Sequence, residues 1–403
     1  MRIRAFAPLM VASFVISPVL ALAQSTNFVQ EIAGADLTPS QNSVLEQLRA
    51  LPSTQEVMIV RINPNALRDQ AEVTLPLPGR APVAVATGSR NILGDRSFSV
   101  AGRTETLGAS ALTNVSPGTS TFAVNGDSVT GTIQTDTGLY RLRPLGGGAH
   151  ALIKAGAFPS EHPPSFNQRQ DQQRDMLPSE KRSEHDTSIV DMTVLVAYTP
   201  AVAQRVADIK GLVDLAFLET NASYQSSGVY IRAIPATVDP IAVNYVEAGS
   251  HDADLAAFRD RADGKMDEIH QKMDDTKADV AVLLISDGSY CGLASDILAP
   301  SKEMAFVVVY HDCATGYYSF AHEIGHLQGA RHNPEADSTS TPFAYGHGYM
   351  DIAHNRRTIM SYDCPNGCRR YPEWSRPSDW GTATLHHDAR AINETRGKIS
   401  SFR

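Results

Sequence analysis

Three histidines and one glutamate in residues 322–332 have the spacing of a metal site with its own base. The stretch reads H-E-x-x-H-x-x-G-x-x-H, with His322, Glu323, His326, Gly329 and His332 at the fixed positions. Side chains four apart lie on one face of a helix, so His322 and His326 can bind one ion together. Gly329 can take a positive φ, which lets the chain turn and bring His332 back as the third ligand. Three nitrogen ligands leave one position for water, the pattern of a catalytic zinc ion.

Glu323 is expected to act beside the metal rather than as a ligand. It follows His322 directly, so its carboxylate is rotated just off the axis that the two helical histidines share. From there it can take a proton from water and deliver it to a leaving group, first as a base and then as an acid. The expected cofactor is one catalytic Zn²⁺. A structural Ca²⁺ is compatible with the sequence but is not indicated by it.

A methionine follows the metal motif at a characteristic place, in Thr358-Ile359-Met360-Ser361-Tyr362. The extended histidine motif with this methionine turn resembles the metzincin clan of zinc endopeptidases. The resemblance implies that Met360 forms an apolar floor beneath the three histidines. In the astacin and serralysin groups, a tyrosine two residues after the methionine is a further zinc ligand, and Tyr362 has that offset. Tyr362 is therefore a ligand, a donor to the transition state, or a core tyrosine with a backbone partner.

Segments on both sides of the metal motif are similar to one branch of this clan. Residues 279–286 and 290–294 resemble the strand and loop that precede the zinc helix in reprolysin-like enzymes. Residues 357–364 and 371–375 resemble bacterial members, which include the peptidyl-Asp metalloendopeptidases. The likeness covers roughly the second half of the chain. It implies an α/β (α+β) catalytic domain with a mixed sheet and a zinc-site helix, and protein or peptide substrates. An extended substrate should pair with an edge strand around residues 294–298.

Two arginines follow the methionine turn, where metzincins form the wall of the pocket for the residue after the cut bond. In this chain the wall would contain Arg369 and Arg370. An arginine that points inward can pair with an acidic side chain, which predicts cleavage before Asp or Glu. The alternative is that both are solvated loop arginines.

Four cysteines lie near the metal motif and none lies in the first half of the chain. Four cysteines allow three connectivities. We favour Cys291 with Cys313 and Cys364 with Cys368, the second pair closing a small loop. The alternative is a second zinc site, but the spacing does not resemble a zinc ribbon and an exported protein favours disulfides.

The first 23 residues resemble a signal peptide. Arg2 and Arg4 precede a short apolar stretch, and Ala21-Leu22-Ala23 supplies a small-x-small cleavage signal. A membrane anchor is the alternative, but the apolar run is short and is broken by proline. We expect a protein that is secreted, or periplasmic as the alternative, and that has no membrane partner after signal removal.

Composition limits the number of domains and the classes of partner. The chain has 403 residues and a net charge of −9, which predicts two or more domains and argues against nucleic acid as the main partner. We expect a monomer.

Periodicity divides the rest of the chain into three blocks. Residues 24–158 are β-rich, with alternating runs at 97–100, 120–124, 128–133 and 138–142 and a hairpin signal in Asn125-Gly126-Asp127. Residues 159–187 are proline-rich and polar and are expected to form a linker. Residues 188–403 should form the catalytic domain. Strands are predicted at 189–198, 229–234, 280–286 and 305–310, and helices near 202–217, 252–274 and 382–400.

This order of blocks predicts a zymogen. The β-rich block would be a propeptide that inhibits its own catalytic domain, and Lys181-Arg182 in the linker is the most evident activation site. The block has no cysteine, which excludes a cysteine latch. Asp95 or His162 could instead close the open metal position. The alternative is that the β-rich block is a permanent binding or sorting domain.

Three functions from different classes compete. They are an active zinc endopeptidase, a catalytically silent metzincin-like binding module, and a zinc hydrolase that acts on a non-peptide bond. Glu323 and the complete histidine set favour the first.

Overall fold

Alternating residues between 29 and 155 form one antiparallel sheet. In the computed structural model, residues 27–94, 97–106, 118–162 and 186–403 are described. The expected signal peptide, Asp95 and Lys181-Arg182 therefore lie outside the described residues. Within them, the strand order of the first sheet is β1-β2-β9-β8-β7-β6-β5-β4-β3. The strands are β1 Val29–Glu31, β2 Thr54–Ile62, β3 Glu72–Leu77, β4 Arg80–Gly94, β5 Ser97–Thr106, β6 Gly118–Asn125, β7 Ser128–Thr135, β8 Gly138–Gly146 and β9 Ala149–Ala155.

The hairpin signal in this block is confirmed. Asn125 at the end of β6 pairs with Ser128 at the start of β7, so two residues form the turn. Gly126 has a φ of 62°, the left-handed conformation that such a turn requires. The strands are flanked by α1 Pro39–Arg49, α2 Pro64–Asp69 and the 3-10 helix η1 Gly34–Asp36.

Residues 190–310 contain a second, mixed sheet. Its main strand order is β11-β10-β13-β15-β14, with β12 also paired to β10. All these pairs are parallel except the antiparallel pair of β14 and β15 at the edge. The predicted mixed sheet is therefore present. Its strands are β10 Val190–Tyr198, β11 Ile231–Pro235, β12 Ile241–Ala242, β13 Val280–Ile285, β14 Gly292–Ala294 and β15 Phe306–Tyr310.

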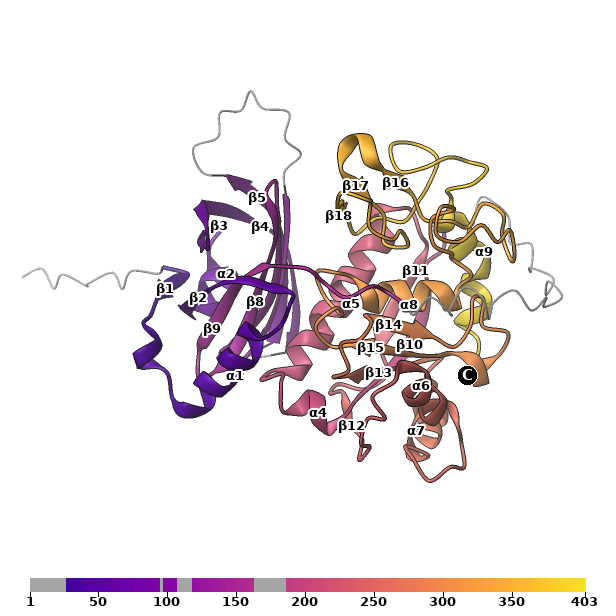
Figure 1. Ribbon diagram of the computed structural model, residues 1–403, viewed down its shortest axis with the longest axis horizontal. Coiled ribbons are helices and arrows are strands. Elements are labelled where there is room, and N and C mark those ends of the chain that lie inside the picture. The colour runs from indigo at the N-terminus through magenta and orange to yellow at the C-terminus, as the bar shows by residue number, and fades with distance from the viewer. Residues whose placement is uncertain (1–26, 95–96, 107–117, 163–185) are drawn as a thin grey trace, which may run out of the picture.

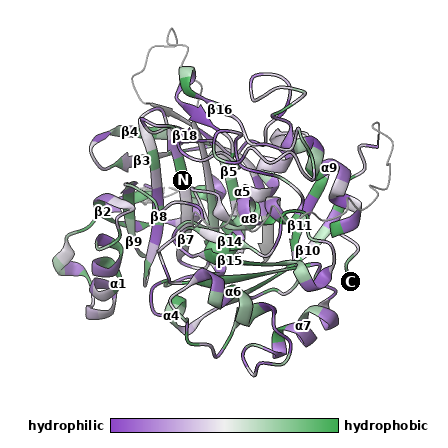
Figure 2. Ribbon diagram, turned by 45° about the vertical axis from the view of Figure 1, so that its right-hand side comes forward, coloured by the Kyte–Doolittle hydropathy of each residue, from purple (hydrophilic) through white to green (hydrophobic). Residues whose placement is uncertain are grey.

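Helices cover both faces of the mixed sheet (Figure 1). Val194 and Val196 face a core that includes residues of α5, α8 and α9, whereas Leu195 and Ala197 face residues of α6 and α7. Burial on both faces explains why β13 and β15 are continuously apolar (Figure 2). The helices are α4 Pro200–Ala203, α5 Ile209–Ser226, α6 His251–Arg259, α7 Glu268–Thr276, α8 Ser319–Leu327 and α9 Asp388–Ile399, with 3-10 helices η2 Lys302–Met304 and η3 Ile352–His354.

Three predicted helices have other bounds in the structure. The single helix predicted at 252–274 is two helices, α6 and α7. Between them, Asp260 and Asp263 each accept a hydrogen bond from the backbone N–H two residues later, and Gly264 and Met266 have positive φ. These local turns compete with helix formation. The helix predicted near 202–217 is split into α4 and α5, and α9 starts at Asp388 instead of Thr382.

A small third sheet follows the metal motif. It contains β16 Met350–Asp351, β17 Arg356–Arg357 and β18 Arg369–Arg370, and β17 pairs in parallel with β18. This pairing brings the chain after the methionine turn back beside the residues before it. In the described residues, no helix is long and apolar enough to cross a membrane.

A buried ion pair joins the antiparallel sheet to the part that carries the metal motif. Arg141 of β8 donates from Nη1 to Asp312 Oδ1 over 2.6 Å, and both side chains are buried. Arg141 also donates to the backbone oxygen of Ser53, and the Ser53 hydroxyl donates to Asp312. Arg143 donates to Thr315 Oγ1 over 2.7 Å. The loop that receives these contacts leads directly into α8.

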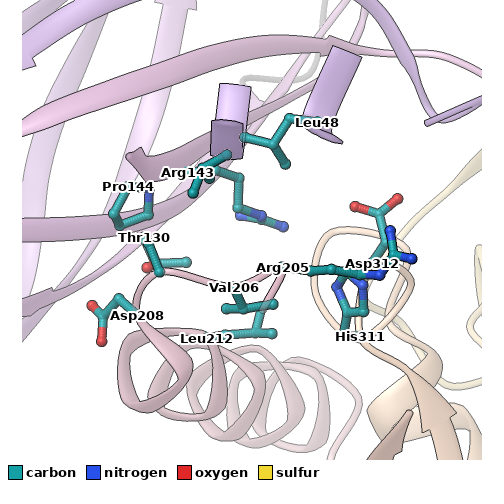
Figure 3. Close-up of a pocket in the computed structure, with 12 residues that line it drawn as sticks. Leu48, Thr130, Arg143, Pro144, Arg205, Val206, Asp208, Leu212, His311 and Asp312 are labelled. Atoms are coloured by element: carbon teal, nitrogen blue, oxygen red, sulfur yellow. The ribbon is translucent and has the colours of Figure 1, made fainter. Parts of the chain in front are cut away.

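Side chains from both parts line a pocket at this boundary. Figure 3 shows Leu48 and Arg143 of the first part opposite Val206, His311 and Asp312 of the second. Helix α5 lies between the two sheets and contacts β6 and β7. The two parts therefore share an interface built from buried charge as well as apolar contacts.

Candidate metal centre

The three motif histidines converge in the interior. His322 and His326 lie on α8, and Gly329, with a φ of 95°, turns the chain so that His332 returns to them. All three side chains are fully buried. Their Nε2 atoms are 3.1 Å apart for His326 and His322, 3.1 Å for His326 and His332, and 3.3 Å for His322 and His332.

Backbone carbonyls contact the outer ring nitrogens of the two helical histidines. His322 Nδ1 lies 2.8 Å from the Ile359 oxygen, and His326 Nδ1 lies 2.9 Å from the Ala330 oxygen. A carbonyl only accepts, so the Nδ1 of His326 carries the proton and its Nε2 presents a lone pair to the centre. The Nδ1 of His322 contacts both the Ile359 oxygen and, over 2.7 Å, the Nη2 donor of Arg370. Burial lowers the pKa of His322, His326 and His332 well below the ordinary value of 6.5, and neutral imidazoles are the form that binds a metal.

This donor set fits a tetrahedral metal ion. Nitrogen ligands at about 2.0 Å from zinc in tetrahedral geometry lie about 3.3 Å from one another, close to the separations of the three Nε2 atoms. Three neutral ring nitrogens this close together in a buried site are suited to a shared positive partner. His322, His326 and His332 are therefore able to hold Zn²⁺.

The carboxylate of Glu323 lies beside this cluster and is fully buried. Burial, together with the nearby carboxylate of Glu161, raises its pKa well above the ordinary value. It sits against the edge strand β14, where a Cβ on Gly292 would lie 2.5 Å from Glu323 Oε1. Only glycine at position 292 leaves room for the carboxylate in this place.

Met360 is fully buried and lies under the zinc-site helix. A Cβ on Gly325, which lies between the two helical histidines, would be 3.1 Å from Met360 Sδ and 2.7 Å from the ring of Trp374. Met360 therefore packs closely against α8 at the position where the metzincin resemblance puts an apolar floor.

Tyr362 packs on the third histidine. The ring centroids of Tyr362 and His332 are 4.3 Å apart, and the backbone N–H of Tyr362 donates to Asn333 Oδ1 over 2.8 Å. Burial raises the pKa of the Tyr362 phenol above its ordinary value. The phenol therefore stays protonated at neutral pH and is able to donate a hydrogen bond near the centre.

The two arginines of the predicted pocket wall take different directions. Arg370 is buried and donates to the backbone oxygens of Ile359 and Tyr317, over 2.9 and 2.8 Å. Ile359 O is also the acceptor for His322. Arg369 instead donates to the backbone oxygen of Thr135 at the end of β7. The structure thus brings Arg370 to the centre and turns Arg369 toward the antiparallel sheet.

The start of the predicted linker lies at the metal centre. Glu161 and His162 are both buried, and the Glu161 carboxylate pairs with Arg370. His162 Nε2 lies 3.0 Å from each oxygen of Glu323. A ring nitrogen of His162 and one of each motif histidine lie within 4.8 Å of one another. Of the two latch residues considered from the sequence, His162 is therefore at the centre, and Asp95 lies outside the described residues.

The favoured disulfide pairing is confirmed. Cys291 is bonded to Cys313, and Cys364 is bonded to Cys368. The first bridge joins the start of the edge strand to the loop before α8. The edge strand itself is Gly292–Ala294, somewhat earlier than the expected 294–298, because the backbone N–H of Leu298 already bonds to His326 on α8.

Neither Glu161 nor Gly292 is predicted as a site residue by the sequence. Glu161 contacts Arg370 from 209 positions away, and no local pattern marks such a pair. Gly292 immediately follows Cys291 in the strand-and-loop run. A glycine in a strand can signal a close approach, but it does not name the side chain that approaches.

Comparison with known proteins agrees with this geometry. Residues 190–375 match the family model Reprolysin_5, metallo-peptidase family M12. A peptidyl-Asp metalloendopeptidase of Xanthomonas campestris is 36% identical over 383 residues, covering 92% of this chain and 91% of that protein. One from Stenotrophomonas maltophilia is 38% identical over 385 residues and 89% of each chain. One from Pseudomonas fragi is 37% identical over 189 residues, which are 46% of this chain and 100% of that protein.

Two of these relatives match along most of the chain, so the similarity extends over the antiparallel sheet as well as the metal centre. The expected likeness to the reprolysin-like branch is confirmed by the family model. This chain belongs to metallopeptidase family M12 and is a zinc metalloendopeptidase.

Proposed function

We propose that this protein is a secreted endopeptidase made as an inactive precursor, with His322, His326 and His332 as the zinc ligands and Glu323 as the general base. The observation that carries the proposal is the convergence of three buried Nε2 atoms within 3.3 Å of one another, with a buried carboxylate on the same helix. Protein and peptide chains are the substrates. A single protomer contains the whole centre, which is compatible with a monomer.

Each side chain has a definite task in peptide hydrolysis. Zinc, when bound, supplies Lewis acidity for the scissile carbonyl and acidifies water. The Glu323 carboxylate takes the proton of the attacking water and passes it to the leaving amine. Tyr362, kept protonated by burial, donates to the oxygen on which negative charge develops.

Arg370 is the residue that would select an acidic side chain in the substrate. Its guanidinium is buried beside the metal ligands, and in this structure it already holds the carboxylate of Glu161. A buried guanidinium favours a carboxylate over a neutral side chain because an unpaired charge there is costly. The relatives named peptidyl-Asp metalloendopeptidase support a preference for Asp, and the same charge on Arg370 would also accept Glu.

The antiparallel sheet is the inhibitory propeptide in this proposal. It is joined to the loop before α8 by the buried Arg141–Asp312 pair, and residues that follow β9 reach the metal centre. Activation would require cleavage in residues 163–185, where Lys181-Arg182 is the proposed site. Export is supported by the signal-like first 23 residues and by the two disulfides.

Cleavage-site mapping by mass spectrometry tests the proposal. The chain cut in residues 163–185 is incubated with a denatured protein mixture, with Glu323→Ala as the matched control. We expect cuts before Asp or Glu that vanish in the control, while the zinc content of the control stays at one ion per chain. If the cuts vanish in the control but show no preference for Asp or Glu, only the proposed role of Arg370 in specificity is refuted. The absence of control-sensitive cuts would refute the peptidase assignment of this site and favour a binding module.

Arg370→Gln, compared with Arg369→Gln, tests the specificity separately. The measured quantity is the ratio of kcat/KM for two peptides that differ only by Asp or Asn after the cut bond. We expect this ratio to fall at least tenfold in Arg370→Gln and to stay within twofold in Arg369→Gln. A ratio, rather than a rate, is used because Arg370 also holds the backbone at Ile359.

A further inference from the structure

Residues 158–162 pass over the metal centre as a strap. The backbone oxygen of Ser160 accepts a hydrogen bond from the N–H of Cys291 over 2.9 Å, and that of Glu161 accepts from Gly292 over 3.1 Å. The strap therefore runs alongside the start of β14, the edge strand at which an extended peptide can add to the sheet.

An aromatic contact anchors the strap before it reaches the centre. Phe158 stacks on Tyr317 with ring centroids 4.4 Å apart, and the guanidinium of Arg141 lies 5.1 Å from the Phe158 ring. Phe158 and Tyr317 also pack against the Cys291–Cys313 bridge. The strap is thus tied at one end to the buried ion pair that joins the two parts of the molecule.

The Glu161 side chain occupies the anion site of the centre. Its carboxylate forms an ion pair with Arg370 Nη1, and both side chains are 2% exposed. The hydroxyl of Ser319, the first residue of α8, donates to Glu161 Oε2 over 3.0 Å. A carboxylate that is this deeply buried and this well paired fills the place where Arg370 would otherwise receive the acidic side chain of a substrate.

The His162 ring stands over the three motif histidines. Its centroid is 5.2 Å from that of His322, 5.0 Å from that of His326 and 4.9 Å from that of His332. It is nearly equidistant from all three, and its Nε2 also contacts both oxygens of Glu323. The ring therefore lies where the fourth ligand of a tetrahedral ion belongs and blocks the carboxylate proposed as the base.

We propose that Glu161 and His162 form a two-part latch, in which His162 is the fourth metal ligand of the precursor and Glu161 occupies the acidic-residue site at Arg370. The inference rests on the proposed peptidase function and names the residues that inhibit the precursor. Each part prevents a different event, since His162 excludes the attacking water and Glu161 excludes the substrate side chain. The strap thus occupies the site of an acidic peptide substrate. It leaves no room for the water that would attack a peptide bond.

Cobalt spectroscopy on the full chain tests the His162 part without reference to activity. The chain carries Glu323→Gln to prevent self-cleavage and is loaded with Co²⁺. We expect His162→Ala to shift the visible absorption bands of the bound Co²⁺ at an unchanged ratio of one ion per chain. Ser160→Ala is the control, because the strap uses only its backbone oxygen. An identical spectrum in His162→Ala and in the parent would overturn the assignment of His162 as a ligand.

Inhibition of the linker-cut enzyme by a synthetic peptide tests both parts together. The probe is an amidated peptide with the sequence of residues 156–162. We expect competitive inhibition that weakens at least tenfold with Glu161→Gln and at least tenfold with His162→Ala in the peptide. Equal inhibition by all three peptides would overturn the latch. Failure of the cut enzyme to cleave any substrate in a Glu323-dependent manner would refute the proposed function instead, and the cobalt result would still decide whether His162 is a ligand.

Discussion

Removal of the Arg141 charge should release the antiparallel sheet from the part that carries the metal centre. Arg141 is fully buried and donates to Asp312 Oδ1 over 2.6 Å and to the Ser53 backbone oxygen over 2.9 Å. In Arg141→Met, the Asp312 carboxylate stays buried, loses its ion-pair partner, and keeps a hydrogen bond from the Ser53 hydroxyl and the charge of nearby Arg143. Breaking a buried pair by removing one partner costs roughly 3–5 kcal/mol. We therefore expect the affinity between the two parts to fall by roughly 10²- to 10³-fold or more.

The assay uses the inactive Glu323→Ala chain with a specific protease site inserted in residues 163–185. After the linker is cut, dissociation of the first part is followed by size-exclusion chromatography over a range of dilutions. Arg80→Met is the matched control, because Arg80 pairs with Asp136 within the same sheet and that aspartate is partly exposed. An ion pair that water reaches on one side is worth far less than a fully buried one, on the order of 1 kcal/mol, so this control should dissociate much like the parent.

The double variant Arg141→Met with Asp312→Leu makes the reasoning refutable. Replacing both members of a buried pair by apolar groups is often neutral or stabilising, so the double variant should recover most of the lost affinity. If Arg141→Met dissociates no more readily than Arg80→Met, the ion pair does not hold the interface. If the double variant is as weak as the single one, lost packing rather than the uncompensated Asp312 charge is the cause.

Three further predictions concern the catalytic part. Gly292→Ala should lower kcat by about 10²-fold or more with zinc content unchanged, because the new methyl group displaces the Glu323 base; normal turnover would contradict the close approach. Burial raises the pKa of Glu219 from 4.5 to about 7, so its carboxyl binds a proton more tightly in the folded state. Folding stability should fall by about 3 kcal/mol as pH rises from 4.5 through 7 and stay low above it. Urea unfolding should lose this dependence in Glu219→Gln, and its persistence there would disprove the assignment. Replacing Cys291 and Cys313 by serine should cost about 3 kcal/mol for a separation of 22 residues, and an unchanged urea midpoint would show that the bridge is not stabilising.

Local patterns predicted the parts of the structure that depend on near neighbours. The strand β10 and the hairpin at Gly126 follow from periodicity and turn chemistry within a few residues. Helix bounds were less well predicted. The turns at Asp260 and Asp263 divide the helix expected at 252–274, because side-chain acceptors there compete with the helical backbone.

The sequence by itself determined the metal-binding motif, because eleven consecutive residues carry the helix spacing and the turn that bring three histidines together. It also restricted the disulfides to three connectivities. The sequence contains two adjacent arginines but does not tell which way either side chain points. Only the tertiary structure decided that Arg370 faces the metal centre while Arg369 faces the antiparallel sheet. It alone brought Glu161 to Arg370, across 209 positions. The physical reason is that such contacts arise from how whole sheets pack, and the periodicity of a single segment does not encode that packing.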